Sequence, residues 1–182
     1  MTMVRAALVA LVAGLIGEPE IAPVAAMATG IAATVVMLDG ADGWLARRSG
    51  ITSEFGARFD MEIDALLIMA LAILAWRHGK AGSWVLFSGL LRYAFVAAGW
   101  FVPWLTHPLP PSRRRQAVCV VQIAGLCVAV SPIATPPLSA IVAATALLAL
   151  AWSFLVDIIW LARVTRPGVI FAPGSVKRER LS

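Results

Sequence analysis

The sequence predicts an all-α integral membrane protein, a bundle of about six transmembrane helices with an active site that faces the cytoplasm. Of its 182 residues, 60% are hydrophobic and only 14% are Asp, Glu, Lys or Arg. Soluble domains are nearer to half apolar and about a quarter charged. The chain therefore has too few polar side chains to cover a water-exposed surface, and we expect lipid to cover much of it.

Six apolar stretches account for the predicted helices, because a helix needs roughly 20 mostly apolar residues to cross a bilayer. They cover residues 4–17, 21–46, 56–76, 82–104, 114–130 and 138–161. Short turns rich in Gly and Pro join most of them, and two longer polar stretches cover residues 47–55 and 106–115. Neither an internal repeat nor a long linker divides the sequence, so we expect residues 1–182 to form a single membrane domain with a basic tail over residues 163–182.

The first stretch has two other interpretations. At about 14 residues it is short for a span and could lie along the membrane interface instead. Its basic start, followed by small residues at Ala25, Ala26 and Ala28, also resembles a secretory signal. We favour a span over a signal, because removal of this stretch would leave five spans and the Glu18-Pro19-Glu20 segment is a poor lead into a cleavage site. The interfacial alternative stays open.

The orientation follows from the basic residues, which are enriched in cytoplasmic loops. With a cytoplasmic N-terminus and six spans, two basic residues lie outside, Arg77 and Lys80, and Arg92 lies within a span. The other twelve lie on the cytoplasmic side: Arg5, Arg47, Arg48, Arg58, Arg113, Arg114, Arg115, Arg163, Arg166, Lys177, Arg178 and Arg180. We therefore expect a multi-pass protein of the inner membrane with both termini in the cytoplasm. The net charge of +5 fits anionic lipid headgroups and no nucleic acid, because the basic residues stand at the ends of apolar runs.

Four aspartates at the inner ends of two predicted helices are the most informative feature. Asp39 and Asp42 are three residues apart, and Asp60 and Asp64 are four apart, so each pair lies on one helix face. Carboxylates are costly near lipid, normally face a protein interior or a water-filled cavity, and mark function by default. A structural polar cluster is the alternative, but four acids are a costly way to build a helix contact.

The aspartates need a cation. Arg47 is the one basic residue within a turn or two along the first pair's face, and one guanidinium cannot neutralise four carboxylates. One or two divalent ions can, and oxygen ligands favour Mg²⁺ or Mn²⁺ over zinc. Gly43 and Gly56 remove side chains where a nucleotide could approach the helices, Ala46 keeps the next turn small, and Arg47 could hold a phosphate.

The segment 39–64 resembles the signature of the CDP-alcohol phosphatidyltransferase family, D-x-x-D-G-x-x-A-R-x8-G-x-x-x-D-x-x-x-D. All its specified positions match, namely Asp39, Asp42, Gly43, Ala46, Arg47, Gly56, Asp60 and Asp64. The six-span layout with cytoplasmic ends is also similar to that family, so the resemblance covers most of the chain.

The resemblance implies a role for each position. Asp39, Asp42 and Asp60, with Asp64 as a further contact, would hold two Mg²⁺ or Mn²⁺ ions that bind the pyrophosphate of a CDP-linked lipid donor, with CDP-diacylglycerol expected. Asp64 would take the proton from an alcohol acceptor, which would attack the phosphorus and release CMP. Gly43, Ala46, Arg47 and Gly56 would line the CDP site. The resemblance also implies a homodimer, in which small residues such as Ala25 to Gly30 would allow close helix packing.

The acceptor is less well defined by the sequence. The run Arg113-Arg114-Arg115, with Arg92, could bind the phosphate of an acceptor such as glycerol 3-phosphate, although topology and headgroup contact explain the run as well. The alternative is a small unphosphorylated alcohol such as inositol, serine or choline. Met61 and Ala65 depart from the residues typical of the glycerophosphate and inositol subgroups.

Three weaker predictions concern single side chains, and one concerns the protein class. Glu62 points away from the aspartate face and should pair with a neighbouring helix or subunit. Asp157 should pair with an arginine, and Arg92 should either pair with an acid or point into the substrate cavity. A cation transporter with an acidic intramembrane site is the alternative from another class. Against it, the aspartates cluster at one membrane face, with no acids in the first and fifth stretches to continue a path.

Overall fold

The computed structural model describes residues 2–19, 21–49, 54–107 and 112–164, and in these residues every element is helical. Side chains are not described for residues 41–49 and 54–58 and a few other positions. The α-helices are α1 (Thr2–Gly14), α2 (Ala22–Ser49), α3 (Glu54–Arg77), α4 (Phe87–Phe101), α5 (Arg113–Val130) and α6 (Leu138–Val164). Three short 3₁₀ segments, η1 (Leu15–Gly17), η2 (Ser83–Leu86) and η3 (Pro103–Thr106), complete the helical elements.

The predicted helices are confirmed at their centres and corrected at some ends. The polar stretch over residues 47–55 was predicted as a connection, but α2 continues to Ser49 and α3 already begins at Glu54. Ala46, Arg47 and Arg48 are good helix formers, so polarity alone did not end the helix. The predicted stretch 82–104 is divided, because α4 ends before Pro103, whose ring cannot continue a helix.

The end of α3 shows how the chain turns back at the opposite end of the bundle. Gly79 has φ +61°, a left-handed conformation that glycine adopts without steric cost. The backbone N–H of Lys80 donates to Ala75 O at 2.9 Å and that of Gly79 to Trp76 O at 3.1 Å. These two bonds are those of a Schellman motif, which satisfies the last carbonyls of a helix.

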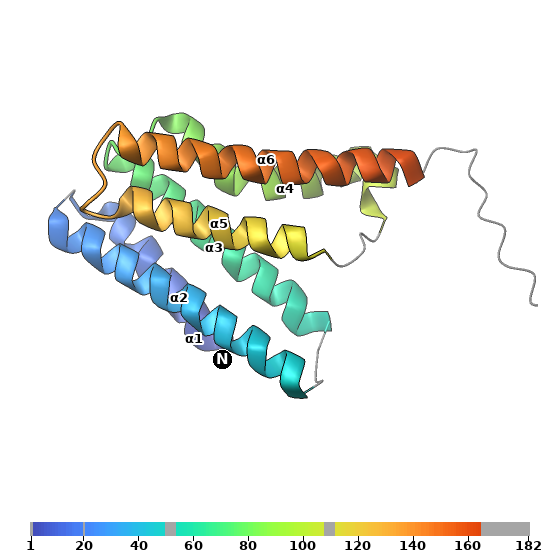
Figure 1. Cartoon of the computed structure of the whole chain (residues 1–182), viewed down its shortest axis with the longest axis horizontal. Helices are drawn as coiled ribbons and strands as arrows, with labels where there is room; N and C mark the ends of the chain where they lie inside the picture. Colours follow the sequence, from blue (N-terminus) through green and yellow to red (C-terminus); the bar gives the residue numbers. More distant parts are fainter. Residues whose placement is uncertain (1, 20, 50–53, 108–111, 165–182) are drawn as a thin grey trace, which may run out of the picture.

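α3 is the central helix. It packs against α1, α4 and α5, while α1 also packs on α2, and α5 lies along α6 (Figure 1). Leu67, Leu71 and Leu74, three or four residues apart on α3, are fully buried. Val9 and Val12 of α1 join the same core, so α1 is an integral part of the bundle.

The ends of the helices are sorted along the long axis of the molecule. Figure 1 shows the C-terminal ends of α2 and α6 on the same side as the N-terminal ends of α3 and α5. The turns that follow η1, α3 and α5 lie on the other side. The stretches 47–49, 54–58 and 113–115 are therefore at one end of the bundle.

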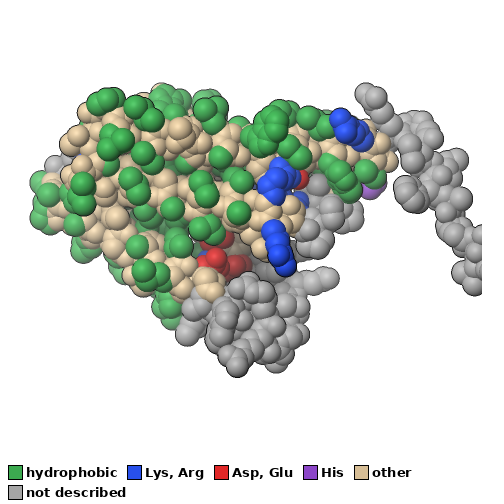
Figure 2. All heavy atoms as spheres, in the orientation of Figure 1, with side chains coloured by type: hydrophobic (Ala, Val, Ile, Leu, Met, Phe, Trp, Pro, Cys, Tyr) green, Lys and Arg blue, Asp and Glu red, His purple; other side chains and the backbone are tan. Residues whose placement is uncertain are grey.

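The outer surface is apolar. Trp100, Phe101, Leu148 and Trp152 are among the exposed large hydrophobic side chains, and Figure 2 shows apolar side chains over most of the described face. Three helical segments are long and apolar enough to cross a membrane, Ala22–Gly40, Ser83–Phe101 and Leu138–Val164, and Met3–Gly17 is a shorter apolar helix. These observations indicate a membrane protein, because exposed apolar side chains over long helices need lipid around them.

Candidate active site

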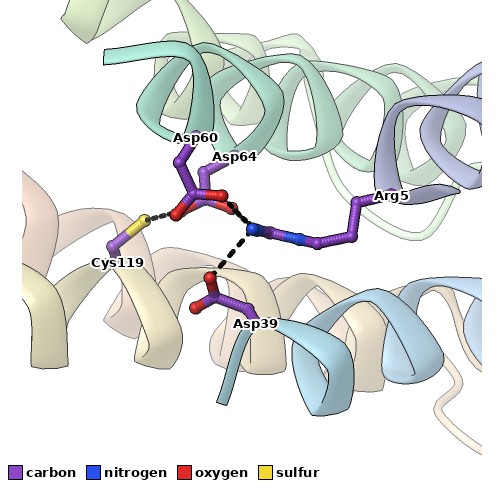
Figure 3. A network of polar contacts seen from close by, with 5 residues as sticks. All are labelled: Arg5, Asp39, Asp60, Asp64 and Cys119. Atoms are coloured by element: carbon purple, nitrogen blue, oxygen red, sulfur yellow. Dashed lines mark hydrogen bonds and ion pairs between the residues drawn. The ribbon is translucent and has the colours of Figure 1, made fainter. Parts of the chain in front are cut away.

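Three of the four predicted aspartates meet around one arginine, Arg5 of α1 (Figure 3). The guanidinium nitrogen Nη1 of Arg5 lies 3.0 Å from Asp39 Oδ1 of α2 and also donates to Asp60 Oδ1 of α3. The other nitrogen, Nη2, donates to Asp64 Oδ1 at 2.8 Å. One cation therefore joins carboxylates from two helices that approach each other from opposite sides.

Helix geometry explains why these carboxylates converge. Asp60 and Asp64 are four residues apart on α3, so their side chains project from the same face of that helix. Asp39 lies on α2, which faces α3 across the site in Figure 3. Arg5 lies near the start of α1, and α1 packs against both α2 and α3. The sequence spacing set the two carboxylate faces, and the packing of α1 placed the cation between them.

The cluster is buried on the arginine side and open on the carboxylate side. The Arg5 side chain is 1% exposed, whereas those of Asp39, Asp60 and Asp64 are 33%, 36% and 20% exposed. Figure 2 shows acidic side chains on the described surface, the larger group of them in the lower middle of the view. A ligand could therefore reach the carboxylates without passing the arginine.

Asp64 has a second neighbour on α5. The Cys119 thiol lies 3.9 Å from Asp64 Oδ2, which is a weak contact for a sulfur donor. Oδ1 of the same carboxylate accepts from Arg5, so the two oxygens have different surroundings. Oδ2 is the oxygen of Asp64 that is not tied to the guanidinium.

The remaining signature residues lie in the helices that build the site. The backbones of Asp42, Gly43, Ala46 and Arg47 belong to α2, and that of Gly56 belongs to α3. Their side chains lie outside the described residues, so their predicted roles stay predictions.

Arg92 and Glu62 form an ion pair between α4 and α3. This confirms that Glu62 pairs with a neighbouring helix. Of the two environments predicted for Arg92, an acid partner or the substrate cavity, the structure shows the acid partner. The Nε atom of Arg92 has no hydrogen-bond partner in the described part of the chain.

The arginine run at the start of α5 divides into different environments. Arg114 pairs with Asp157 of α6 and donates from Nη1 to the Ser153 carbonyl at 2.9 Å, which confirms the predicted arginine partner of Asp157. Arg113 is exposed, and Arg115 is half-buried. Arg114 is therefore engaged at the α5–α6 contact, whereas the Arg113 side chain is exposed.

Arg5 is the site residue that sequence reasoning missed. It was assigned to the cytoplasmic side as one of twelve basic residues that set the orientation. The signal in the sequence is its place four residues into an apolar helix, where an unpaired charge is costly, so that a partner acid was needed. The identity of that partner depends on how α1 packs, which the sequence pattern does not give.

Comparison with known protein families shows the family to which this chain belongs. The family model described as CDP-alcohol phosphatidyltransferase matches residues 1–162 of the chain. The chain belongs to this family. Neither the curated proteins nor the solved structures gave a match. Membership implies an enzyme that transfers a phosphatidyl group from a CDP-alcohol to an acceptor.

The CDP-alcohol phosphatidyltransferase family is generally dependent on divalent metal, so we asked whether the site suits such an ion. Among the described side chains, no three His, Cys, Asp or Glu residues are spaced as a metal centre. Three carboxylate oxygens nevertheless surround one positive charge, with Arg5 in the place of a cation. All the donors are oxygens, which suits Mg²⁺ or Mn²⁺. The residues thus fit the implied metal in kind.

Proposed function

We propose that this family member transfers a phosphatidyl group from CDP-diacylglycerol to an alcohol, releasing CMP, at the inner surface of the cytoplasmic membrane. The observation that carries the proposal is the convergence of Asp39, Asp60 and Asp64 on one positive charge, in a chain matched by the family model over residues 1–162. Such a cluster of carboxylates suits the binding of divalent ions and of the phosphate groups that those ions hold.

Asp39, Asp42, Asp60 and Asp64 are the residues that would hold the metal. Bound Mg²⁺ or Mn²⁺, in our proposal two ions, would neutralise charge on the donor pyrophosphate. Gly43, Ala46, Arg47 and Gly56 stand next to these aspartates in the sequence and would line the CDP site, with the Arg47 guanidinium suited to a phosphate.

Asp64 is the proposed general base. Its Oδ2 is not bonded to Arg5, so this oxygen can accept the proton of the acceptor hydroxyl. The acceptor oxygen then forms a bond to the phosphorus that carries the lipid alcohol. The bond from that phosphorus to the oxygen of the CMP phosphate breaks, and CMP leaves with the electron pair.

The position of the site suits a lipid donor. Asp39 lies at the end of the apolar segment Ala22–Gly40, and the aspartates are partly exposed there. In the six-span arrangement with cytoplasmic termini that we propose, the diacylglycerol tails would stay in the bilayer while the headgroup met the carboxylates. Water-soluble acceptors would reach the same end of the bundle.

A polyol phosphate such as glycerol 3-phosphate is the proposed acceptor. The arginine run at the start of α5 lies at the same end of the bundle as the site, and Arg113 is exposed there while Arg114 engages Asp157. Arg92 is a further candidate, although Glu62 already pairs with it. The same chemistry with inositol, serine or choline is the alternative.

We also propose that the protein acts as a homodimer. Small residues that could pack two copies closely lie on α2, but Ala25 and Ala28 are buried inside the bundle. Ala26 and Gly30 are exposed on the same helix and would be the contact positions.

The test is CMP release from CDP-diacylglycerol by the purified protein in detergent, in the presence of Mg²⁺ or Mn²⁺. Glycerol 3-phosphate, inositol phosphate, inositol, serine and choline would be supplied separately, and Asp64→Asn would serve as the inactive control. We expect release with one acceptor, lost in Asp64→Asn and on chelation. A protein that binds neither CDP nor metal and releases no CMP would refute the proposal and leave a transporter as the better hypothesis.

A further inference from the structure

Arg5 has an unusual position for a residue near the start of a membrane-protein helix. Its side chain is 1% exposed and contacts three carboxylates, Asp39, Asp60 and Asp64. A guanidinium buried to this extent is costly unless acids pair with it. The three aspartates supply that pairing, so Arg5 is part of the site's electrostatics as well as of its packing.

The contacts of Arg5 use the oxygens that a metal ion would need. Each of the three aspartates faces the guanidinium through its Oδ1 atom. A divalent ion held by the same oxygens would lie where the guanidinium nitrogens lie, and the two positive charges would repel each other. Arg5 and such an ion cannot both occupy this position.

The charge balance leads to the same conclusion. Before a donor binds, two divalent ions carry four positive charges, which balance the four carboxylates of Asp39, Asp42, Asp60 and Asp64. Arg5 would then be an excess positive charge in a buried place. With no ion bound, Arg5 is needed, because the carboxylates would repel one another.

We propose that Arg5 is a built-in competitor of the metal: its guanidinium holds the aspartates together, and it must leave them before divalent ions bind. This inference rests on the proposed function, because it assumes that these aspartates bind metal. Arg5 is thus a positioning residue that keeps α1, α2 and α3 joined at the site and lowers its affinity for metal.

The place of Arg5 in α1 makes such an exchange feasible. Met3 and Val4, its neighbours toward the N-terminus, are exposed. The arginine side chain is long and flexible, so its charged end can reach a more polar surface while its stem stays among apolar groups. We therefore expect an exchange of partners to proceed mainly through a rotamer change of Arg5.

The experiment measures Mn²⁺ binding to the full-length protein in detergent, by the loss of the electron paramagnetic resonance signal of free Mn²⁺. The variants are Arg5→Gln and Arg5→Lys. Arg114→Gln is the matched control, because it also removes an arginine that pairs with an aspartate, at the α5–α6 contact. Asp60→Asn establishes which binding belongs to the site.

We expect Arg5→Gln to bind Mn²⁺ at least tenfold more tightly than the unchanged protein, a difference of about 1.4 kcal/mol. A competitor that occupies the site most of the time lowers the apparent affinity by the fraction of molecules in which the site is open. Arg5→Lys should lie between the two, because one ammonium group cannot bridge the carboxylates as two guanidinium nitrogens do. Arg114→Gln should bind as the unchanged protein does.

Thermal unfolding gives an independent readout. Without Mn²⁺, Arg5→Gln should unfold at a lower temperature than the unchanged protein, because the carboxylates lose their cation. With saturating Mn²⁺ it should regain more stability than the unchanged protein gains, since tighter binding stabilises more. Arg5→Lys keeps a cation at this position. If Arg5→Gln fails to fold, the unfolding temperatures of Arg5→Lys with and without Mn²⁺ can be compared with those of the unchanged protein instead.

The outcomes separate the inference from the proposed function. Mn²⁺ binding that is lost in Asp60→Asn but equal or weaker in both Arg5 variants would overturn the competition and leave the metal site standing. Absence of Mn²⁺ binding in every protein, the unchanged one included, would overturn both. Mn²⁺ binding that is tighter in the Arg5 variants, and unchanged in Arg114→Gln, supports the competition.

Discussion

The contact between α5 and α6 offers a sharp test of the packing that holds α5 beside the site. A methyl group added at Gly125 of α5 would lie 2.8 Å from the Cβ atom of Ala146 on α6. Non-bonded carbon atoms pack at about 3.5–4.0 Å. Gly125→Ala therefore forces the two helices apart or shifts their backbones.

The size of the effect follows from two opposing terms. Replacing glycine by alanine inside a helix stabilises it by about 1 kcal/mol through helix propensity. Overpacking by one methyl group costs about 1–3 kcal/mol. Gly40→Ala on α2 has the first term without the second, because nothing lies within 4 Å of its added methyl group. We expect Gly125→Ala to be less stable than Gly40→Ala by the overpacking term.

The assay is thermal unfolding in detergent, with a double-mutant cycle that includes Ala146→Gly. Removing the methyl group at Ala146 opens the space that the new one needs, so Gly125→Ala should stabilise the Ala146→Gly protein and destabilise the unchanged one. The coupling between the two positions should be about 1–3 kcal/mol. Coupling near zero, with Gly125→Ala as stable as Gly40→Ala, would refute the close approach of α5 and α6.

Three further predictions concern the contacts around the site. Asp157→Asn should lower the free energy of unfolding by about 1–3 kcal/mol, because it leaves the half-buried Arg114 without its carboxylate; a double-mutant cycle with Arg114→Gln should recover part of the loss, and simple additivity would contradict the ion pair. Glu62→Gln should cost less than about 1 kcal/mol by the same thermal assay, since Glu62 is half exposed. Cys119→Ser should retain CMP release within about threefold, because a contact of 3.9 Å to Asp64 is weak; a loss of a hundredfold would mean that the thiol acts in the reaction.

Much of the fold could be predicted because lipid imposes a simple rule on the sequence. Apolar stretches bounded by Gly, Pro and charges predicted α5 to within one residue at each end and α6 to within three residues. The rule fails where a helix leaves the apolar region, since polar residues such as Arg47 and Arg48 continue α2 without cost. Helix ends near the site therefore had to come from the structure.

The carboxylates of the site could be predicted from the sequence, but the arginine that pairs with them could not. The spacing of Asp60 and Asp64 fixes a common face within one helix, which the sequence shows directly. The contact of Arg5 with them joins positions 55 and 59 residues apart. Such a contact depends on which face of α1 packs on α3, and many apolar faces of α1 look alike in the sequence.

The three arginine contacts together explain how the bundle is held near the site. Arg5 joins α1 to α2 and α3, Arg92 joins α4 to α3, and Arg114 joins α5 to α6. Among the described side chains of α3, the buried apolar residues begin at Ile63, next to the aspartates, and the fully buried leucines begin at Leu67. Apolar packing cannot continue to the end of the bundle if the carboxylates are to stay accessible to ligands. Ion pairs between helices are a means of keeping this end together while leaving it polar, and Arg5 does so with the carboxylates that we propose for metal. The same contact that stabilises the fold would then set the affinity of the site.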